Sequence, residues 1–123
     1  MFFAHPFPII FSPDENYVAS EQGILELGTG HITVLEEGRG YTNFGNYCPP
    51  ILPDELAYSP DGQILAFAGC GTLKLWRARD GVLLNELDSQ TYRLVFSLDG
   101  TYLLGLGDGY INVWGISTSP LPK

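Results

Sequence analysis

Hydrophobic residues along this chain come in short runs separated by clusters of glycine, proline, aspartate and serine. Residues 72–76, Thr-Leu-Lys-Leu-Trp, alternate between polar and apolar side chains, as a half-buried β-strand does. Residues 64–68, Ile-Leu-Ala-Phe-Ala, are continuously apolar, which is typical of a short strand buried on both faces. No window shows sustained helical periodicity. The pattern therefore predicts an all-β fold of short strands and tight turns.

This pattern repeats along the chain. Residues 58–62, Tyr-Ser-Pro-Asp-Gly, open a segment that closes at Trp76, and residues 96–100, Phe-Ser-Leu-Asp-Gly, open a second one 38 residues later that closes at Trp114. In both copies the tryptophan stands 17 positions after the serine, and a weaker third copy begins at residues 11–14. Such self-similarity indicates stacked supersecondary units, none of which can bury its apolar faces alone.

Each unit divides into predicted antiparallel strands joined by turn residues, because proline presets φ and glycine accepts positive φ. The first unit has strands at 8–12, 16–20, 23–27 and 31–36, the second at 56–59, 64–68, 72–76 and 82–87, and the third at 93–97, 102–106 and 110–114. Aligning the Thr-Gly turn at 29–30 with the Asp-Gly turn at 80–81 places Leu25 where the other units have tryptophan, with four residues deleted nearby.

These residues resemble the WD-repeat family of β-propellers. The features that carry the resemblance are Ser-Pro-Asp-Gly at 59–62, a third strand ending in Leu-Trp at 75–76 or Val-Trp at 113–114, and the Asp-Gly turn at 80–81. The match extends from about residue 8 to residue 116. It implies a partial β-propeller of about three four-stranded antiparallel blades, with four, four and three strands.

The resemblance also implies how the chain is divided. The expected boundaries are a single propeller segment over 1–123, with blade 1 at 7–37, a long connecting loop at 38–54, blade 2 at 55–88, a three-stranded blade 3 at 91–116 and a C-terminal tail at 117–123. Propellers need about four to eight blades to close a ring. Three alternatives follow: the C-terminal part of a larger propeller, which we favour, a ring assembled from several copies, or an open arc.

The sequence departs from the family pattern at several positions. Arg77 and Gly115 follow the two tryptophans in place of the acidic residue that names the family, and the usual Gly-His pair is absent before the second and third units. Only Asp108 and Trp114 could supply two members of the family's buried polar network, so we expect packing to hold the blades. The expected structural repeat positions are Ser12, Asp14, Ser59, Asp61, Trp76, Ser97, Asp99, Asp108 and Trp114.

The long loop at 38–54 is the strongest candidate for a binding segment, because long loops without periodicity are often functional or disordered. Tyr41, Phe44 and Tyr47 stand at three-residue intervals, with Asn43 between them. Large aromatic side chains with polar groups are typical anchors of protein interfaces. The alternative, which we favour, is that these aromatics fold back and shield the neighbouring blade.

Other chemistry is sparse. With 14 acidic and 6 basic residues the net charge is −8 and no basic run is present, which argues against nucleic-acid binding. His5 and His31 have no activating serine or cysteine motif nearby, so we predict no catalytic, metal or cofactor site. Cys48 and Cys70 would lie on the same face of one blade by the resemblance; free buried thiols are the favoured state and a disulfide the alternative.

The leading functional hypothesis is a non-catalytic scaffold that binds one or more protein partners, with self-association through the open ends of the stack as a further alternative. A second hypothesis is a regulatory or gating segment of an enzyme whose catalytic part lies elsewhere. Because we find no signal peptide or membrane span, we expect a soluble protein and favour the cytoplasm.

Overall fold

The computed structural model describes residues 9–20, 23–37, 55–69, 71–89, 91, 93–107 and 109–116. All regular structure in these residues is β-structure. The strands are β1 (Ile9–Phe11), β2 (Tyr17–Ser20), β3 (Gly23–Glu26), β4 (Ile32–Val34), β5 (Glu55–Tyr58), β6 (Ile64–Gly69), β7 (Thr72–Arg77), β8 (Leu83–Asp88), β9 (Arg93–Phe96), β10 (Tyr102–Gly107) and β11 (Tyr110–Gly115).

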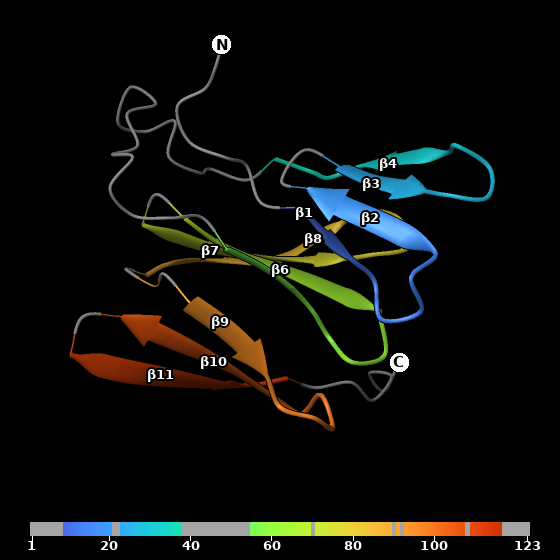
Figure 1. The fold of residues 1–123 in the computed structure, drawn as a ribbon. Coiled ribbons are helices and arrows are strands. Elements are labelled where there is room, and N and C mark those ends of the chain that lie inside the picture. Colours follow the sequence, from blue (N-terminus) through green and yellow to red (C-terminus); the bar gives the residue numbers. More distant parts are fainter. Residues whose placement is uncertain are drawn as a thin grey trace, which may run out of the picture.

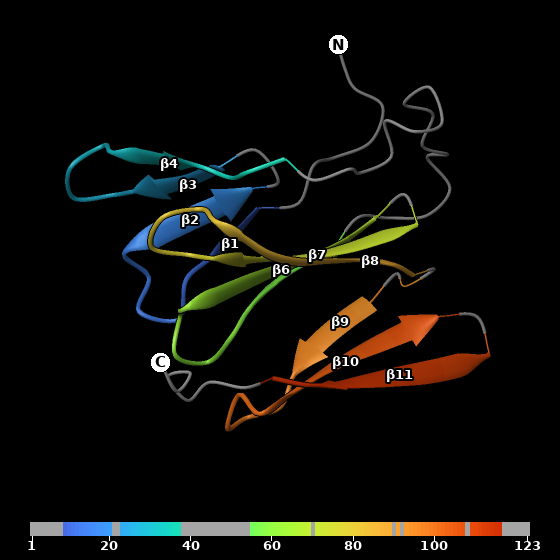
Figure 2. The same ribbon diagram turned by 180° about the vertical axis from the view of Figure 1, so that it is seen from behind.

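The described strands form three separate antiparallel sheets of four, four and three strands, each in sequence order. We call these sheets unit 1 (β1–β4), unit 2 (β5–β8) and unit 3 (β9–β11). Figures 1 and 2 show them stacked face over face, with unit 2 in the middle. Strand β5 contacts both β1 and β9, so the first strands of successive units lie beside one another. The predicted partial propeller with four, four and three strands is confirmed.

Pairing of the second and third strands shows which residues are equivalent between units. Leu65 pairs with Trp76 in unit 2, and Leu103 pairs with Trp114 in unit 3. In unit 1 the residue in the same place of the ladder is Leu25, which pairs with Val18. The predicted alignment of Leu25 with the two tryptophans is therefore confirmed.

Unit 2 is buried on both faces because its strands alternate between two neighbours. Leu65 and Phe67 belong to an apolar cluster shared with unit 1, whereas Ala66 and Ala68 belong to a second cluster shared with unit 3. Adjacent residues of a strand point to opposite faces of the sheet, so a strand between two apolar layers must be apolar throughout. This explains the uninterrupted apolar run in β6.

The turn between the first and second strands is closed by the same hydrogen bonds in every unit. In unit 2, Ser59 Oγ donates to Asp61 Oδ1 at 2.7 Å, the amide of Gln63 donates to the same carboxylate at 3.0 Å, and the amide of Ile64 donates to Ser59 Oγ at 3.0 Å. The corresponding contacts are made by Ser12 and Asp14 in unit 1 and by Ser97 and Asp99 in unit 3. The recurrence of these residues in the sequence thus reflects the needs of one turn.

One position of this turn differs in unit 1. Gly62 and Gly100 adopt positive φ of 77° and 78°, but the equivalent residue in unit 1 is Glu15, at φ 64°. A left-handed conformation costs a residue with a Cβ roughly 1–2 kcal/mol, a cost that glycine avoids. Unit 1 therefore contains a strained residue where the other units do not.

Replacing this glutamate by glycine should stabilise the protein. We expect Glu15→Gly to raise the free energy of unfolding by about 1 kcal/mol, because it relieves the positive φ. Urea denaturation followed by circular dichroism measures the change. Glu15→Ala is the matched control, since it removes the carboxylate and keeps the strain. An equal gain from both variants would show that charge, and not backbone conformation, is responsible.

Candidate functional site

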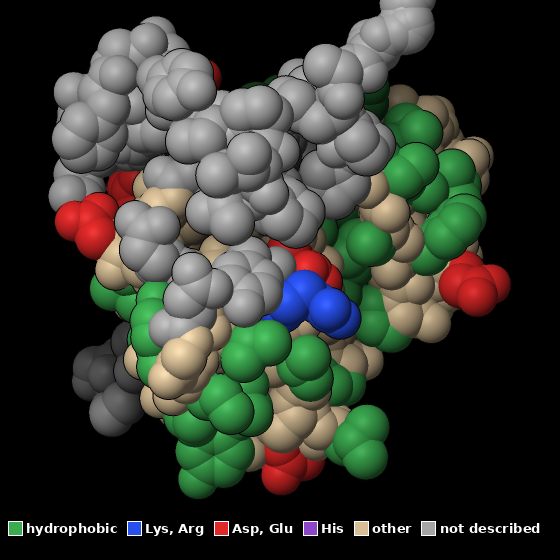
Figure 3. Space-filling model, turned by 60° about the vertical axis from the view of Figure 1, so that its left-hand side comes forward, with side chains coloured by type: hydrophobic (Ala, Val, Ile, Leu, Met, Phe, Trp, Pro, Cys, Tyr) green, Lys and Arg blue, Asp and Glu red, His purple; other side chains and the backbone are tan. Residues whose placement is uncertain are grey.

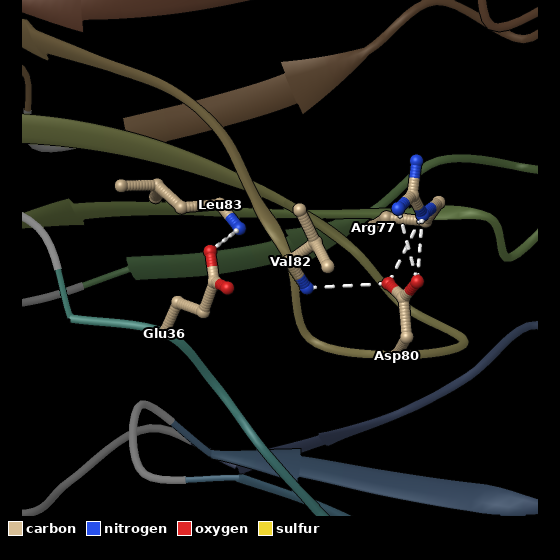
Figure 4. A network of polar contacts seen from close by, with 5 residues as sticks. All are labelled: Glu36, Arg77, Asp80, Val82 and Leu83. Atoms are coloured by element: carbon tan, nitrogen blue, oxygen red, sulfur yellow. Dashed lines mark hydrogen bonds and ion pairs between the residues drawn. The ribbon is translucent and has the colours of Figure 1, made fainter.

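Several polar contacts between units 1 and 2 are made by Glu36. Its backbone carbonyl accepts a hydrogen bond from Trp76 Nε1 at 2.8 Å, and its amide donates to the carbonyl of Gly81 at 2.9 Å. Its side chain also takes part, because the amide of Leu83 donates to Glu36 Oε1 at 2.7 Å (Figure 4). Glu36 thus ties the end of unit 1 to the third and fourth strands of unit 2.

Gly81 allows this close approach. It has φ 76°, and a Cβ built on it would overlap the backbone carbonyl oxygen of Val34. Any larger residue at this position would force the two units apart. The Asp-Gly pair at residues 80–81 predicts a turn, but nothing in the sequence indicates that Gly81 also contacts unit 1.

The turn between the third and fourth strands carries a polar pair in both four-stranded units. In unit 2, Arg77 Nη2 lies 3.0 Å from Asp80 Oδ2, and Arg77 Nε donates to the same carboxylate, which also accepts from the amide of Val82 at 3.2 Å (Figure 4). The hydrogen bond from Arg77 lowers the pKa of Asp80 and raises the pKa of Arg77. Both side chains are exposed, so the pair contributes little to stability.

Unit 1 builds the same turn from different side chains. Thr29 Oγ1 donates to Glu26 Oε1 at 3.0 Å and accepts from the amide of His31 at 3.1 Å. Glu26 follows Leu25, so it stands where Arg77 stands in unit 2. Unit 1 therefore has an acidic residue at the position where the two tryptophan-containing units have arginine and glycine. This equivalence is not evident from the tryptophan motif in the sequence, because unit 1 has no tryptophan to mark the position before Glu26.

A cavity of about 370 Å³ lies between units 1 and 2. The first and third turns of unit 2 lie side by side, because the amide of Ala78 in the third turn donates to the carbonyl of Gln63 after the first turn at 2.8 Å. Both residues line the cavity, so the cavity lies at this end of the stack. Arg77 and Arg79 line it from unit 2, and His31 lines it from unit 1. Two of the six lysine and arginine residues of this acidic chain thus line one cavity, together with the acidic Glu26, and one of the two, Arg77, is paired with Asp80.

Tyr58, which lines this cavity, carries an unsatisfied hydrogen-bonding group. Its hydroxyl is buried and, among the described residues, is the one buried side-chain polar atom without a hydrogen-bond partner. Burial raises the pKa of Tyr58 to about 12, so the hydroxyl stays protonated at neutral pH. An unpaired buried donor costs free energy.

The structure locates part of the predicted site. Trp76 is buried at 3% exposure, whereas Trp114 is half-buried. Asp108, Cys48, Cys70 and the loop residues Tyr41, Asn43, Phe44 and Tyr47 lie outside the described residues. Within the described ranges no group of three or more histidine, cysteine, aspartate or glutamate residues could hold a metal ion. Nor does that part of the chain contain a helix long and apolar enough to cross a membrane.

Comparison with known proteins supports the propeller interpretation. The family model for the WD domain, G-beta repeat (WD40) matches residues 55–77, which cover β5 to β7 of unit 2. No curated protein matches the chain. The crystal structure of the computationally designed Ika8 protein, which is propeller-like, matches with a TM-score of 0.62 and 24% sequence identity.

The match to Ika8 covers 88% of this chain and 32% of the designed protein, so this chain spans about a third of the length of that structure. At this level of identity the likeness shows the fold alone. Together with the family match, it confirms the resemblance to WD-repeat propellers that the repeated segments predict.

The two tryptophans should differ in their contribution to stability. We expect Trp76→Ala to lower the free energy of unfolding by about 3–5 kcal/mol, because a fully buried aromatic and its hydrogen bond to Glu36 are both lost. Trp114→Ala is the matched control and should cost clearly less, since its ring is half-buried. Chemical denaturation measures both values. Equal losses would mean that the inter-unit hydrogen bond and deeper burial of Trp76 contribute nothing.

Two of the turn aspartates should make stability depend on pH. Hydrogen bonds from the backbone of Asn16 and the side chain of Thr101 lower the pKa values of Asp14 and Asp99, respectively, below 3.8. A carboxylate with a lowered pKa in the folded state stabilises the protein above its unfolded pKa, and this contribution is lost as the pH falls. The free energy of unfolding should therefore decrease below about pH 4.

The variant Asp14→Asn/Asp99→Asn should flatten this decrease, as measured by thermal unfolding between about pH 5 and pH 2. Asp88→Asn, which removes an exposed carboxylate on β8 and leaves the turns intact, serves as the control. If the double variant has the same pH dependence as the natural sequence, these turns do not contribute to it.

Proposed function

We propose that this chain is a non-catalytic scaffold that binds a protein partner through the loops of its propeller stack. The observation that carries the proposal is the WD40 repeat at residues 55–77, set in the middle of three stacked sheets. WD40 repeats generally build protein-interaction propellers, and a rigid β-framework is a suitable support for binding loops.

Rigidity is supported by contacts that recur between and within the units. Each described first turn is closed by its own serine and aspartate, and Glu36 binds unit 2 through three hydrogen bonds. Apolar clusters fill both junctions between sheets. Loops attached to such a framework lose less conformational entropy on binding than loops on a flexible chain.

We place the principal binding segment at the loop 38–54. Both of its ends lie at the same end of the stack, because Val34 pairs with Gly23 beside the second turn of unit 1 and Glu55 pairs with Ala68 beside the equivalent turn of unit 2. The loop therefore leaves and re-enters the stack at the end opposite the cavity. Its tyrosine and phenylalanine side chains are suited to anchoring a protein surface.

The cavity between units 1 and 2 offers a second contact for the same role. Arg79 is exposed at its edge, and Tyr58 lines its wall. An aspartate or glutamate side chain of a bound protein would pair with Arg79. This contact would favour an acidic segment of the partner although the chain itself is acidic.

The loop can be tested by substitution. A protein retained by the immobilised chain would be purified and its affinity measured by calorimetry. We expect Tyr41→Ala/Phe44→Ala/Tyr47→Ala to abolish binding with little change in melting temperature, since hot-spot aromatics dominate interface energy. Tyr102→Ala, which removes an exposed aromatic from β10, is the matched control and should bind normally.

Two results would contradict this location of the site. Loss of folded structure in the triple variant would mean that the aromatics shield the blade. Loss of binding in Arg79→Ala with full binding by the triple variant would place the principal contact at the cavity instead.

A further inference from the structure

The two outer sheets of the stack each have an apolar face that no described strand covers. Unit 2 shows what such faces do, because one of its faces contacts unit 1 and the other contacts unit 3. The outer face of unit 1 corresponds to the first of these, and the outer face of unit 3 corresponds to the second. We call them the head face and the tail face.

The head face consists of residues at positions that are covered in unit 2. Its members are Ile9, Phe11, Val18, Leu25, Leu27 and Ile32. By strand register they are equivalent to Leu56, Tyr58, Leu65, Trp76, Ala78 and Leu83, all of which pack in the cluster between units 1 and 2. Apart from the partly buried Val18, the head-face side chains are between 37% and 67% exposed.

The tail face follows the same rule on unit 3. Its members are Val95, Leu104, Leu106, Ile111 and Val113, equivalent to Ala57, Ala66, Ala68, Leu73 and Leu75, which pack in the cluster between units 2 and 3. Apart from the partly buried Leu104, these side chains are between 41% and 63% exposed. Figure 3 shows hydrophobic side chains gathered over the lower part of the molecule, at the height of unit 3 in Figure 1.

The first turns of the units show that the stacking contact itself repeats. A Cβ on Gly62 would lie 3.7 Å from Pro13 Cδ, and one on Gly100 would lie 3.6 Å from Pro60 Cδ. The second residue of the Ser-Pro-Asp turn, Pro13 in unit 1 and Pro60 in unit 2, thus lies against the first turn of the next unit. In unit 3 this second residue is Leu98, which is 97% exposed and is covered by no other turn among the described residues.

From these observations we propose that a second copy of this chain binds head to tail, with the head face of one copy on the tail face of the other. The two faces are the two halves of an interface that the chain already forms twice within itself. The listed head-face residues carry no charge, and the tail face has one charged neighbour, Arg93, which pairs with Leu106 across the sheet and forms an ion pair with Glu55 of unit 2. The proposal is independent of partner binding by the loop.

The number of units limits the assembly. Two copies bring together six units, which lies within the range of about four to eight blades that close a ring, whereas three copies would bring nine. Head-to-tail contacts close into a ring only when the rotation per unit permits it. The expected assembly is therefore a dimer of about 27 kDa, twice the 13.5 kDa of one chain.

Sedimentation equilibrium of the natural sequence is the first test. At about 100 μM even an association with a Kd of ~10 μM is well populated, so a dimer mass is expected there with dissociation on dilution. Two variants then block one face each: Ile9→Asp/Phe11→Asp for the head and Ile111→Asp/Val113→Asp for the tail. Each should be monomeric alone, because a charge would be buried without a partner.

An equimolar mixture of the two variants is the decisive arm, since it restores one intact head and one intact tail. We expect the mixture to form a dimer. The concentration needed for dimerisation should be higher than for the natural sequence, because only one of the two interfaces remains. Leu84→Asp, at an exposed position on the central unit, is the matched control and should dimerise normally. Circular dichroism checks that all variants are folded.

The proposal is overturned if the natural sequence stays monomeric at this concentration. It is also overturned if either blocked variant still dimerises alone, because that would indicate a face-to-face contact between identical surfaces. A mixture that remains monomeric, with both variants folded, would equally contradict a head-to-tail interface.

Discussion

The structure depends on one constraint: a β-sheet that is apolar on both faces must be covered on both faces. In unit 2 this is met by a neighbour on either side, with Phe67 and Trp76 facing unit 1 and Ala68 and Leu73 facing unit 3. Successive side chains of each strand point to opposite faces of the sheet, so the same strands need an apolar neighbour on both sides. A unit of this kind is stable only within a stack, which is why the fold is built from repeats.

Polar contacts then fix how the sheets meet. Apolar surfaces alone would permit sliding, but the hydrogen bonds of Glu36 and the close approach at Gly81 define one position of unit 1 on unit 2. The serine and aspartate of each first turn satisfy backbone amides that would otherwise lack partners. These groups are small in number, yet they select one arrangement among many that hydrophobic burial would allow.

Much of the fold could be predicted from the sequence because it depends on local periodicity. The strand alternation, the turn residues and the alignment of Leu25 with Trp76 all follow from spacing along the chain. The acceptor for Trp76 could not be predicted, because it is a backbone carbonyl 40 residues away and carries no side-chain signal. The cavity was missed for a similar reason, since its walls come from two units.

The two tryptophans occupy the same position of the repeated motif but are buried to different extents. Trp76 is covered by a fourth strand, with which it pairs at Leu83, and lies against Phe67 at a ring separation of 6.3 Å. The residue in the place of Phe67 in unit 3 is Gly105, and a Cβ there would collide with the Trp114 ring. The sequence shows both tryptophans at the same spacing, but only the packing of neighbouring strands decides how deeply each is buried.

Proton exchange at the Trp76 indole tests the central claim most directly, because it reports on the contact between two sheets that share no strand pairing. We expect the Nε1 proton to be protected to nearly the stability of the whole fold and to show a nuclear Overhauser contact to the backbone of Glu36. Rapid exchange of this proton in the folded protein, with no contact to Glu36, would contradict the stacking of unit 1 on unit 2.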